Sequence, residues 1–226
     1  MANFKSKAWV LYLILGGIAV ALYTSDTTWQ AAAEVLRDSL VLTWMVSIMN
    51  ILFFGNGLSR LFGIRPRQPI GLIGIAISPL LHRDLGHLFA NTVPFLVLGW
   101  LIVLQGEIQG ESEFYAITAT VMLIGGMGTW LFGRNAIHVG ASGIIFGYIG
   151  YLLSGVYVGP TLITLIFAGC VFWLYGNQLW SMMPSSDEKR ISWEGHLFGF
   201  VGGIVAGTRP DFLSSLGEGF NQLLSQ

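Results

Sequence analysis

Residues 193–207 read WEGHLFGFVGGIVAG, a polar opening that leads into an apolar run with a recurring glycine. Gly199, Gly203 and Gly207 follow His196 at intervals of four, so on a helix they lie on one face. Small residues on such a face let a neighbouring backbone approach closely inside a membrane. The stretch therefore predicts a membrane helix that packs tightly against a partner helix, with a histidine near its start.

The composition of the whole chain agrees with a membrane environment. Of its 226 residues, 54% are hydrophobic and only 10% are charged, and the mean hydropathy is +0.67. Soluble domains of this size rarely show such values. The net charge is −1 and there is no long basic run, which excludes nucleic-acid binding. The single cysteine, Cys170, cannot form an internal disulfide.

The apolar runs set the architecture. They occur near 8–23, 40–55, 68–81, 87–105, 114–133, 141–158, 160–176 and 195–208. Because a spanning helix needs about 20 apolar residues, and at least roughly 17, the runs from 87 onward are expected to span. The segment 69–81 is shorter and contains Pro69 and Pro79, so we expect a half-embedded loop there. The sequence predicts an all-α, polytopic membrane helix bundle.

The N-terminal part leaves two interpretations open. Residues 8–23 follow Lys5 and Lys7 and end near small residues, which fits a cleaved signal peptide as well as an uncleaved membrane anchor. We favour the anchor. The expected organisation is an N-terminal hydrophobic segment at 1–35, a transmembrane core at 36–210 and a C-terminal tail at 211–226.

A few polar residues stand at the starts of the apolar runs. They are His87 and Asn91 before one span, Ser142 before a second and His196 before the last. Two crossings separate the first of these helices from the second, and two more separate the second from the third. All three helices therefore begin on the same side of the membrane, and their polar residues share one depth. Polar groups at such depth are by default candidates for function.

These residue types at one depth fit acyl transfer. A serine hydroxyl becomes a nucleophile when a neighbouring base takes its proton, and histidine suits that work near neutral pH. Ser142 is then the nucleophile and His196 the base. His87 and Asn91 are four residues apart and share a helix face, so both can donate to a developing oxyanion. The Ser142 amide, at a helix start, is a third donor.

Each of these features has a structural alternative. GASG at 140–143, with Gly140 and Gly143, fits close helix packing by itself, and residue 144 breaks the G-x-S-x-G pattern of soluble hydrolases. His196 alone fits an interfacial histidine, and the His87 and Asn91 pair fits a structural contact between helices. Of the remaining polar residues, we expect His138 to be solvated, His82 to point elsewhere, and Glu194 to be a loop residue.

Taken together, the motifs resemble the rhomboid intramembrane serine proteases. The resemblance rests on His82 and His87 followed by Asn91, then GASG at 140–143, then His196 with G-x-x-x-G, and it covers roughly 60–210. It implies a six-helix core, with an additional N-terminal helix if residues 8–23 span. It also implies a Ser142 and His196 dyad, with an oxyanion site formed by the Ser142 amide, His87 and Asn91. The implied partners are transmembrane protein substrates and membrane lipids, and no metal or organic cofactor is implied.

The chain departs from the family pattern in three places. Phe146 stands where the family often has a tyrosine, His138 precedes the GASG motif, and the usual Trp-Arg pair of the first loop is missing. The resemblance implies a bacterial inner membrane or its equivalent, with the active face outside the cytoplasm. Arginines on that face oppose this orientation under the positive-inside rule.

The sequence is compatible with three classes of function. The first is the protease, and the second is an inactive rhomboid-like protein that binds membrane clients. The third is a small transporter or channel, which predicts ionisable residues spread through the depth of the bundle. The clustering of polar residues at helix starts favours the protease. The substrate and the oligomeric state are not encoded in the sequence.

Overall fold

The computed structural model of the chain describes residue 16 and residues 27–105, 111–184 and 192–224. Within these ranges the fold is helical, and one isolated bridge joins Ile64 to His138. The elements are α3 (Thr27–Ile48), η1 (Met49–Phe53), α4 (Gly57–Phe62), η2 (Pro69–Leu72), α5 (Ile73–Ile77), η3 (Ser78–Leu80), α6 (Leu85–Leu104), α7 (Glu111–Phe132), α8 (Ser142–Val158), α9 (Leu162–Tyr175), η4 (Gly176–Met182), α10 (Trp193–Thr208) and α11 (Phe212–Leu224). The predicted all-α polytopic bundle is confirmed.

Four helical segments within the described ranges are long and apolar enough to cross a membrane. They are Ala33–Phe53, Leu85–Leu104, Phe114–Phe132 and Leu162–Met182. The first contains much of the run at 40–55, whereas residues 8–23 lie outside the described residues apart from Gly16. Helix α8 has 17 residues, so at 1.5 Å per residue it is about 26 Å long and stops short of the roughly 30 Å hydrocarbon layer.

The segment at 69–81 does not span. It folds as three short helical pieces, η2, α5 and η3, and a proline stands in the first turn of both η2 and η3. Proline is tolerated in a first turn because its missing N–H would have no partner there. The predicted half-embedded segment is therefore helical, but too short to cross.

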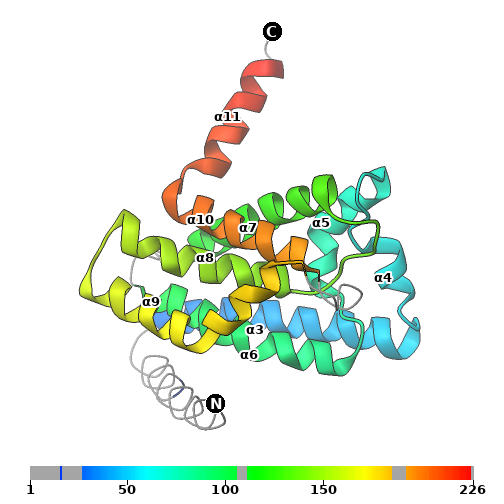
Figure 1. Cartoon of the computed structure of the whole chain (residues 1–226), viewed down its shortest axis with the longest axis horizontal. Helices are drawn as coiled ribbons and strands as arrows, with labels where there is room; N and C mark the ends of the chain where they lie inside the picture. The colour runs from blue at the N-terminus through cyan, green and yellow to red at the C-terminus, as the bar shows by residue number, and fades with distance from the viewer. Residues whose placement is uncertain (1–15, 17–26, 106–110, 185–191, 225–226) are drawn as a thin grey trace.

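Helices α8 and α10 lie side by side near the centre of the bundle and run in the same direction (Figure 1). A Cβ added at Gly199 would collide with the carbonyl of Gly143, and one turn later a Cβ at Gly203 would collide with the carbonyl of Gly147. The glycine face predicted for α10 is thus a backbone-to-backbone contact with α8. Since both contacts advance together along the two helices, α8 and α10 begin on the same side.

Helix α6 runs parallel to α8 as well. The imidazole of His87 lies against Gly140 just before α8, and eight residues further along both helices the rings of Phe95 and Tyr148 lie 5.8 Å apart. Tyr148 is fully buried, and its hydroxyl is 2.8 Å from the Thr118 hydroxyl of α7. The three helices therefore begin on one side, as the count of crossings predicts.

Candidate functional site

The loop before α8 is held in an unusual backbone conformation at Gly140, whose φ is +115°. L-residues with a side chain rarely adopt such a φ. A Cβ at this position would also stand 2.7 Å from Cε1 and 2.9 Å from Nε2 of His87. Glycine is therefore required twice here, once for the turn that leads into Ser142 and once for the close approach of the His87 imidazole.

His82 also contacts the turn before α8, and this contact was not predicted from the sequence. The Ala141 N–H donates to Nε2 of His82 over 3.4 Å, and the other ring nitrogen lies 2.9 Å from the Ser47 hydroxyl, which donates to the Leu80 carbonyl over 2.8 Å. Because Nε2 accepts, Nδ1 carries the hydrogen and donates to Ser47. Burial, together with the neighbouring His87, lowers the pKa of His82 to about 3. This imidazole is neutral and structural, and the expectation that it points elsewhere is wrong.

His196 stands in the first turn of α10 and faces α8. Its ring is stacked on Phe146, with ring centroids 4.2 Å apart and an interplanar angle of 10°. Phe146 follows Ser142 by four residues, so both side chains lie on the same face of α8. The stacking therefore places the imidazole on the helix face that carries the serine.

The hydrogen bonds of His196 define its tautomer. Its Nδ1 lies 3.2 Å from the Ser181 carbonyl oxygen and 3.0 Å from the Ser181 hydroxyl, which itself donates to the Gln178 carbonyl. Both neighbours can accept, and a carbonyl can do nothing else, so Nδ1 carries the hydrogen. The assignment leaves Nε2 unprotonated. Ser181 belongs to η4 and was not singled out in the sequence, where a serine beside Trp180 gives no signal of this contact.

His87 and Asn91 occupy the first turns of α6, which the Asp84 side chain caps by accepting the His87 N–H over 2.8 Å. The Asn91 amide nitrogen donates to the His87 carbonyl over 2.9 Å. Asn91 is buried, and Nδ1 of His87 has no hydrogen-bond partner among the described residues. Both side chains therefore keep polar groups that are not fully used within the fold.

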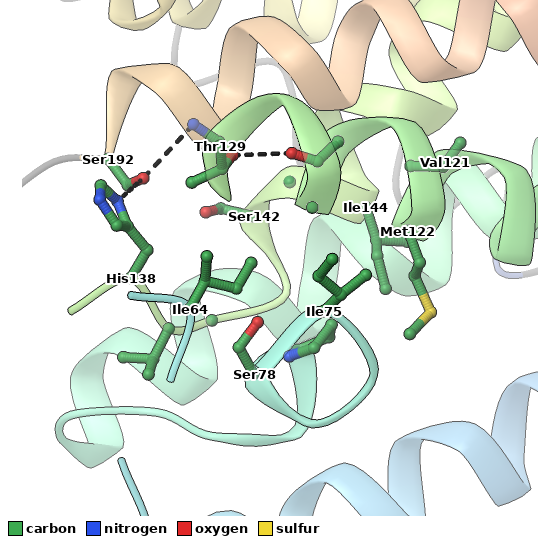
Figure 2. Close-up of a pocket in the computed structure, with 17 residues that line it drawn as sticks. Ile64, Ile75, Ser78, Val121, Met122, Thr129, His138, Ser142, Ile144 and Ser192 are labelled. Atoms are coloured by element: carbon green, nitrogen blue, oxygen red, sulfur yellow. Dashed lines mark hydrogen bonds between the residues drawn. The ribbon is translucent and has the colours of Figure 1, made fainter. Parts of the chain in front are cut away.

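An open cavity of about 820 Å³ lies at the starts of α6, α8 and α10. Its walls include Ser142, His196, His87 and Asn91, the four residues predicted from the sequence. A smaller cavity of about 50 Å³ also reaches Ser142 and is lined in part by Ser78, Thr129, His138 and Ser192. In Figure 2 the Ser142 hydroxyl points to the side of this smaller cavity on which His138 and Ser192 lie.

Two residues near the site differ from expectation. His138 is buried, with 5% of its surface exposed, and Glu194 is fully buried in the first turn of α10. Glu194 forms an ion pair with Arg134, in which Nε lies 3.4 Å from Oε1. Burial lowers the pKa of His138 below its usual value, although the hydrogen bond to the Arg134 carbonyl raises it in part. The predictions of a solvated His138 and of a loop position for Glu194 are therefore wrong.

Comparisons with known proteins agree on one family. The Rhomboid domain matches residues 69–209. An uncharacterized protein of Mycobacterium tuberculosis is 37% identical over 195 residues, which cover 81% of this chain and 78% of the relative. YdcA of Bacillus subtilis, which bears the name of a rhomboid protease, is 29% identical over 131 residues, 57% of this chain and 63% of the relative. RHOMBOID-like protein 1 of Arabidopsis thaliana is 30% identical over 135 residues, 56% of this chain and 31% of the relative. No solved structure matches the chain significantly.

Proposed function

Since this chain belongs to the rhomboid family, we propose that it is an intramembrane serine endopeptidase that cleaves transmembrane segments of other proteins. Ser142 is the proposed nucleophile and His196 the proposed general base. The observation that carries the proposal is the orientation of His196. Its ring is stacked on Phe146, one turn beyond Ser142, and its Nδ1 hydrogen is used by Ser181.

This tautomer supports base catalysis. Because Nδ1 carries the hydrogen, the lone pair of Nε2 is available to take the proton of the Ser142 hydroxyl as the oxygen attacks a carbonyl carbon. The imidazolium that forms keeps its hydrogen bond to the Ser181 carbonyl, and then returns the proton to the leaving amine. In this scheme the Ser181 carbonyl orients the imidazole, a role that an acidic residue fills in a triad.

The neighbouring donors support stabilisation of the tetrahedral intermediate. The amides of Gly140 and Ala141 are already used by the Ser78 carbonyl and by His82. The Ser142 amide is at the first position of α8, where an N–H has no acceptor within the helix. Together with the side chains of His87 and Asn91 it forms the proposed oxyanion site. Loss of one such donor typically costs about 3 to 4 kcal/mol of transition-state stabilisation.

The depth of the site favours a transmembrane substrate. A helix of about 26 Å fits within a hydrocarbon layer of roughly 30 Å, so the proposed position of the start of α8, with Ser142, is below the surface of that layer. A spanning segment must unwind locally to present a peptide bond there. Hydrolysis of the acyl-enzyme also needs water, and the cavity of about 50 Å³ beside Ser142 has room and polar partners for it. The proposed location is a bacterial inner membrane or its equivalent.

Labelling by a fluorophosphonate probe tests the proposal. Purified protein in detergent is expected to label covalently, and Ser142→Ala and His196→Ala are each expected to abolish labelling while the thermal unfolding midpoint stays close to wild type. Ser154→Ala, on the same helix outside the large cavity, is the matched control and is expected to label normally. A family member that only binds clients would not label, and equal labelling of Ser142→Ala would end the protease proposal.

A further inference from the structure

An ion pair between buried Glu194 and partly exposed Arg134 connects the first turn of α10 to the loop that follows α7. Oε1 of Glu194 accepts the backbone N–H of Arg134 over 3.0 Å and lies 3.4 Å from the guanidinium Nε. Oε2 of Glu194 is buried with no hydrogen-bond partner among the described residues. A buried carboxylate is costly to desolvate, and a hydrophobic side chain of similar size often packs as well or better. The stability of the bundle alone does not account for this residue.

A second contact joins the same two elements. Nε2 of His138 lies 3.2 Å from the Arg134 carbonyl, which can only accept, so Nε2 carries the hydrogen and Nδ1 is the acceptor. The Ser192 hydroxyl donates to Nδ1 over 2.6 Å and accepts the Gly195 N–H over 3.4 Å (Figure 2). The hydrogen bonds therefore run in one direction, from the first turn of α10 through Ser192 and His138 to the loop.

These four residues, Arg134, His138, Ser192 and Glu194, form what we call the α10 clamp. On α10 the clamp residues are Ser192 and Glu194, which flank Trp193 and precede His196 by one turn or less. The other two lie in the loop that continues directly into Ser142. We propose that Ser192 and Glu194 are positioning residues that fix the imidazole of His196 relative to the hydroxyl of Ser142. The inference rests on the proposed protease function and assigns this role to residues outside the dyad and the oxyanion site.

Glu194 does not act as the acid of a triad. The Nδ1 position of His196, where such an acid would bind, is occupied by the carbonyl and the hydroxyl of Ser181. The carboxylate instead contacts Arg134. Its influence on His196 therefore passes through the position of the helix, and a misplacement of about 1 Å can cost on the order of a hundredfold in rate.

The glycine contacts between α8 and α10 do not provide this restraint. At Gly199 and Gly203 one backbone lies on another without interlocking side chains. Such a surface permits close approach, but it resists rotation of α10 about its axis only weakly. Polar contacts at Ser192 and Glu194 are directional, so they fix the rotation of the first turn of α10, in addition to the packing of Phe198 against α7.

Probe kinetics separate positioning from folding. The variants are Ser192→Ala, Ser192→Thr and Glu194→Gln, with Glu218→Gln on the exposed face of α11 as the matched control. For each one, the maximal fluorophosphonate inactivation rate, the apparent probe affinity and the thermal unfolding midpoint are measured. Ser192→Ala is expected to lower the maximal rate by about tenfold or more with unchanged probe affinity, because the probe still enters the cavity but meets a displaced base.

The conservative variants sharpen the test. Ser192→Thr keeps the hydroxyl and is expected to restore most of the rate lost in Ser192→Ala. Glu194→Gln keeps an acceptor for the Arg134 N–H but loses the charge, so a smaller loss of rate is expected. Glu218→Gln is expected to match wild type in rate, affinity and unfolding midpoint.

The outcomes distinguish this inference from the proposed function. If folded Ser192→Ala and Glu194→Gln both label at the wild-type rate while Ser142→Ala is inert, the α10 clamp has no positioning role and the protease proposal stands. A labelling rate that falls only in proportion to the unfolded fraction of a variant also overturns the positioning role of the α10 clamp. If wild-type protein does not label at all, the proposed function itself fails. Should Glu194→Gln not fold, the Ser192→Ala and Ser192→Thr pair decides.

Discussion

Gly140 is the residue at which backbone conformation and site geometry meet. Its positive φ turns the chain into α8, and its missing Cβ makes room for the His87 imidazole. Gly140→Ala is expected to lower the free energy of unfolding by about 1 to 3 kcal/mol through backbone strain. It is also expected to slow fluorophosphonate labelling, because His87 must move away from the methyl group.

The measurements are thermal unfolding in detergent and the labelling rate of the folded protein. Gly159→Ala is the matched control, since this glycine ends α8 at a negative φ of −148° and no heavy atom lies within 4 Å of its added Cβ. The interpretation of Gly140 is wrong if Gly140→Ala and Gly159→Ala behave alike.

His82 predicts a dependence of stability on pH. Its folded pKa of about 3 lies below the ordinary histidine pKa of 6.5, so between these values the unfolded chain binds more protons than the folded chain. The stability that the neutral imidazole contributes is therefore complete above pH 6.5 and is lost as the pH falls, by up to about 1.4 kcal/mol per pH unit.

Replacement of His82 by glutamine tests whether this imidazole causes the pH dependence of stability. Glutamine offers an acceptor oxygen and a donor NH2 group but does not titrate in this range. The decrease in the unfolding midpoint from pH 7 to pH 5 is expected to be smaller in His82→Gln than in wild type. Equal decreases in the two proteins would assign the pH dependence to other groups.

The sequence predicted residue types better than it predicted the contacts between them. Ser142, His196, His87 and Asn91 could be found because polar residues are costly in apolar runs and therefore stand out. Ser181 and Glu194 could not, because their roles depend on how a loop folds back onto α10. No periodicity encodes such a contact between segments that are distant in the chain.

At the scale of the helix, the glycines of α10 are expected to be exceptions to the rule that Gly→Ala stabilises a helix. Alanine in place of glycine within a helix usually stabilises it by about 1 kcal/mol. At Gly203 the added methyl group would collide with the Gly147 carbonyl, so Gly203→Ala is expected to destabilise the protein by about 1 to 3 kcal/mol. Thermal unfolding in detergent measures the effect.

Gly169→Ala on α9 provides the comparison, because no heavy atom lies within 4 Å of a Cβ added there. We expect its unfolding midpoint to be unchanged or raised. If Gly203→Ala is as stable as Gly169→Ala, then α8 and α10 do not pack as closely as described.

The arrangement of the helices was largely predictable, and their supporting segments were not. Spacing of apolar runs defined the spans and the parity of the crossings, and the parallel contacts of α6, α8 and α10 agree with it. The pairing of Ile64 with His138 joins the segment before η2 to the loop before α8. A single bridge of this kind leaves no pattern in the sequence, so the burial of His138 could not be predicted.

At the scale of the whole molecule, the charges on the side of the candidate site oppose the orientation that the family implies. Arg60, Arg67 and Arg134 lie on the side where α6, α8 and α10 begin, and the positive-inside rule would place that side in the cytoplasm. Their guanidinium groups have structural partners: Arg60 donates to the Gly55 carbonyl, Arg67 to the Leu131 and Gly133 carbonyls, and Arg134 pairs with Glu194.

These contacts give the arginines a reason to be in the loops that is independent of topology. We therefore expect the side of the candidate site to face away from the cytoplasm. The C-terminus, which follows α10, is expected to lie in the cytoplasm. A fluorescent-protein fusion at Gln226 is expected to fluoresce, and an alkaline phosphatase fusion at the same position to be inactive. Fusions after Arg134 should give the opposite pattern, since three crossings, by α8, α9 and α10, separate the two sites. Phosphatase activity at Gln226 would reverse the orientation, and would place the Ser142 cavity on the cytoplasmic side.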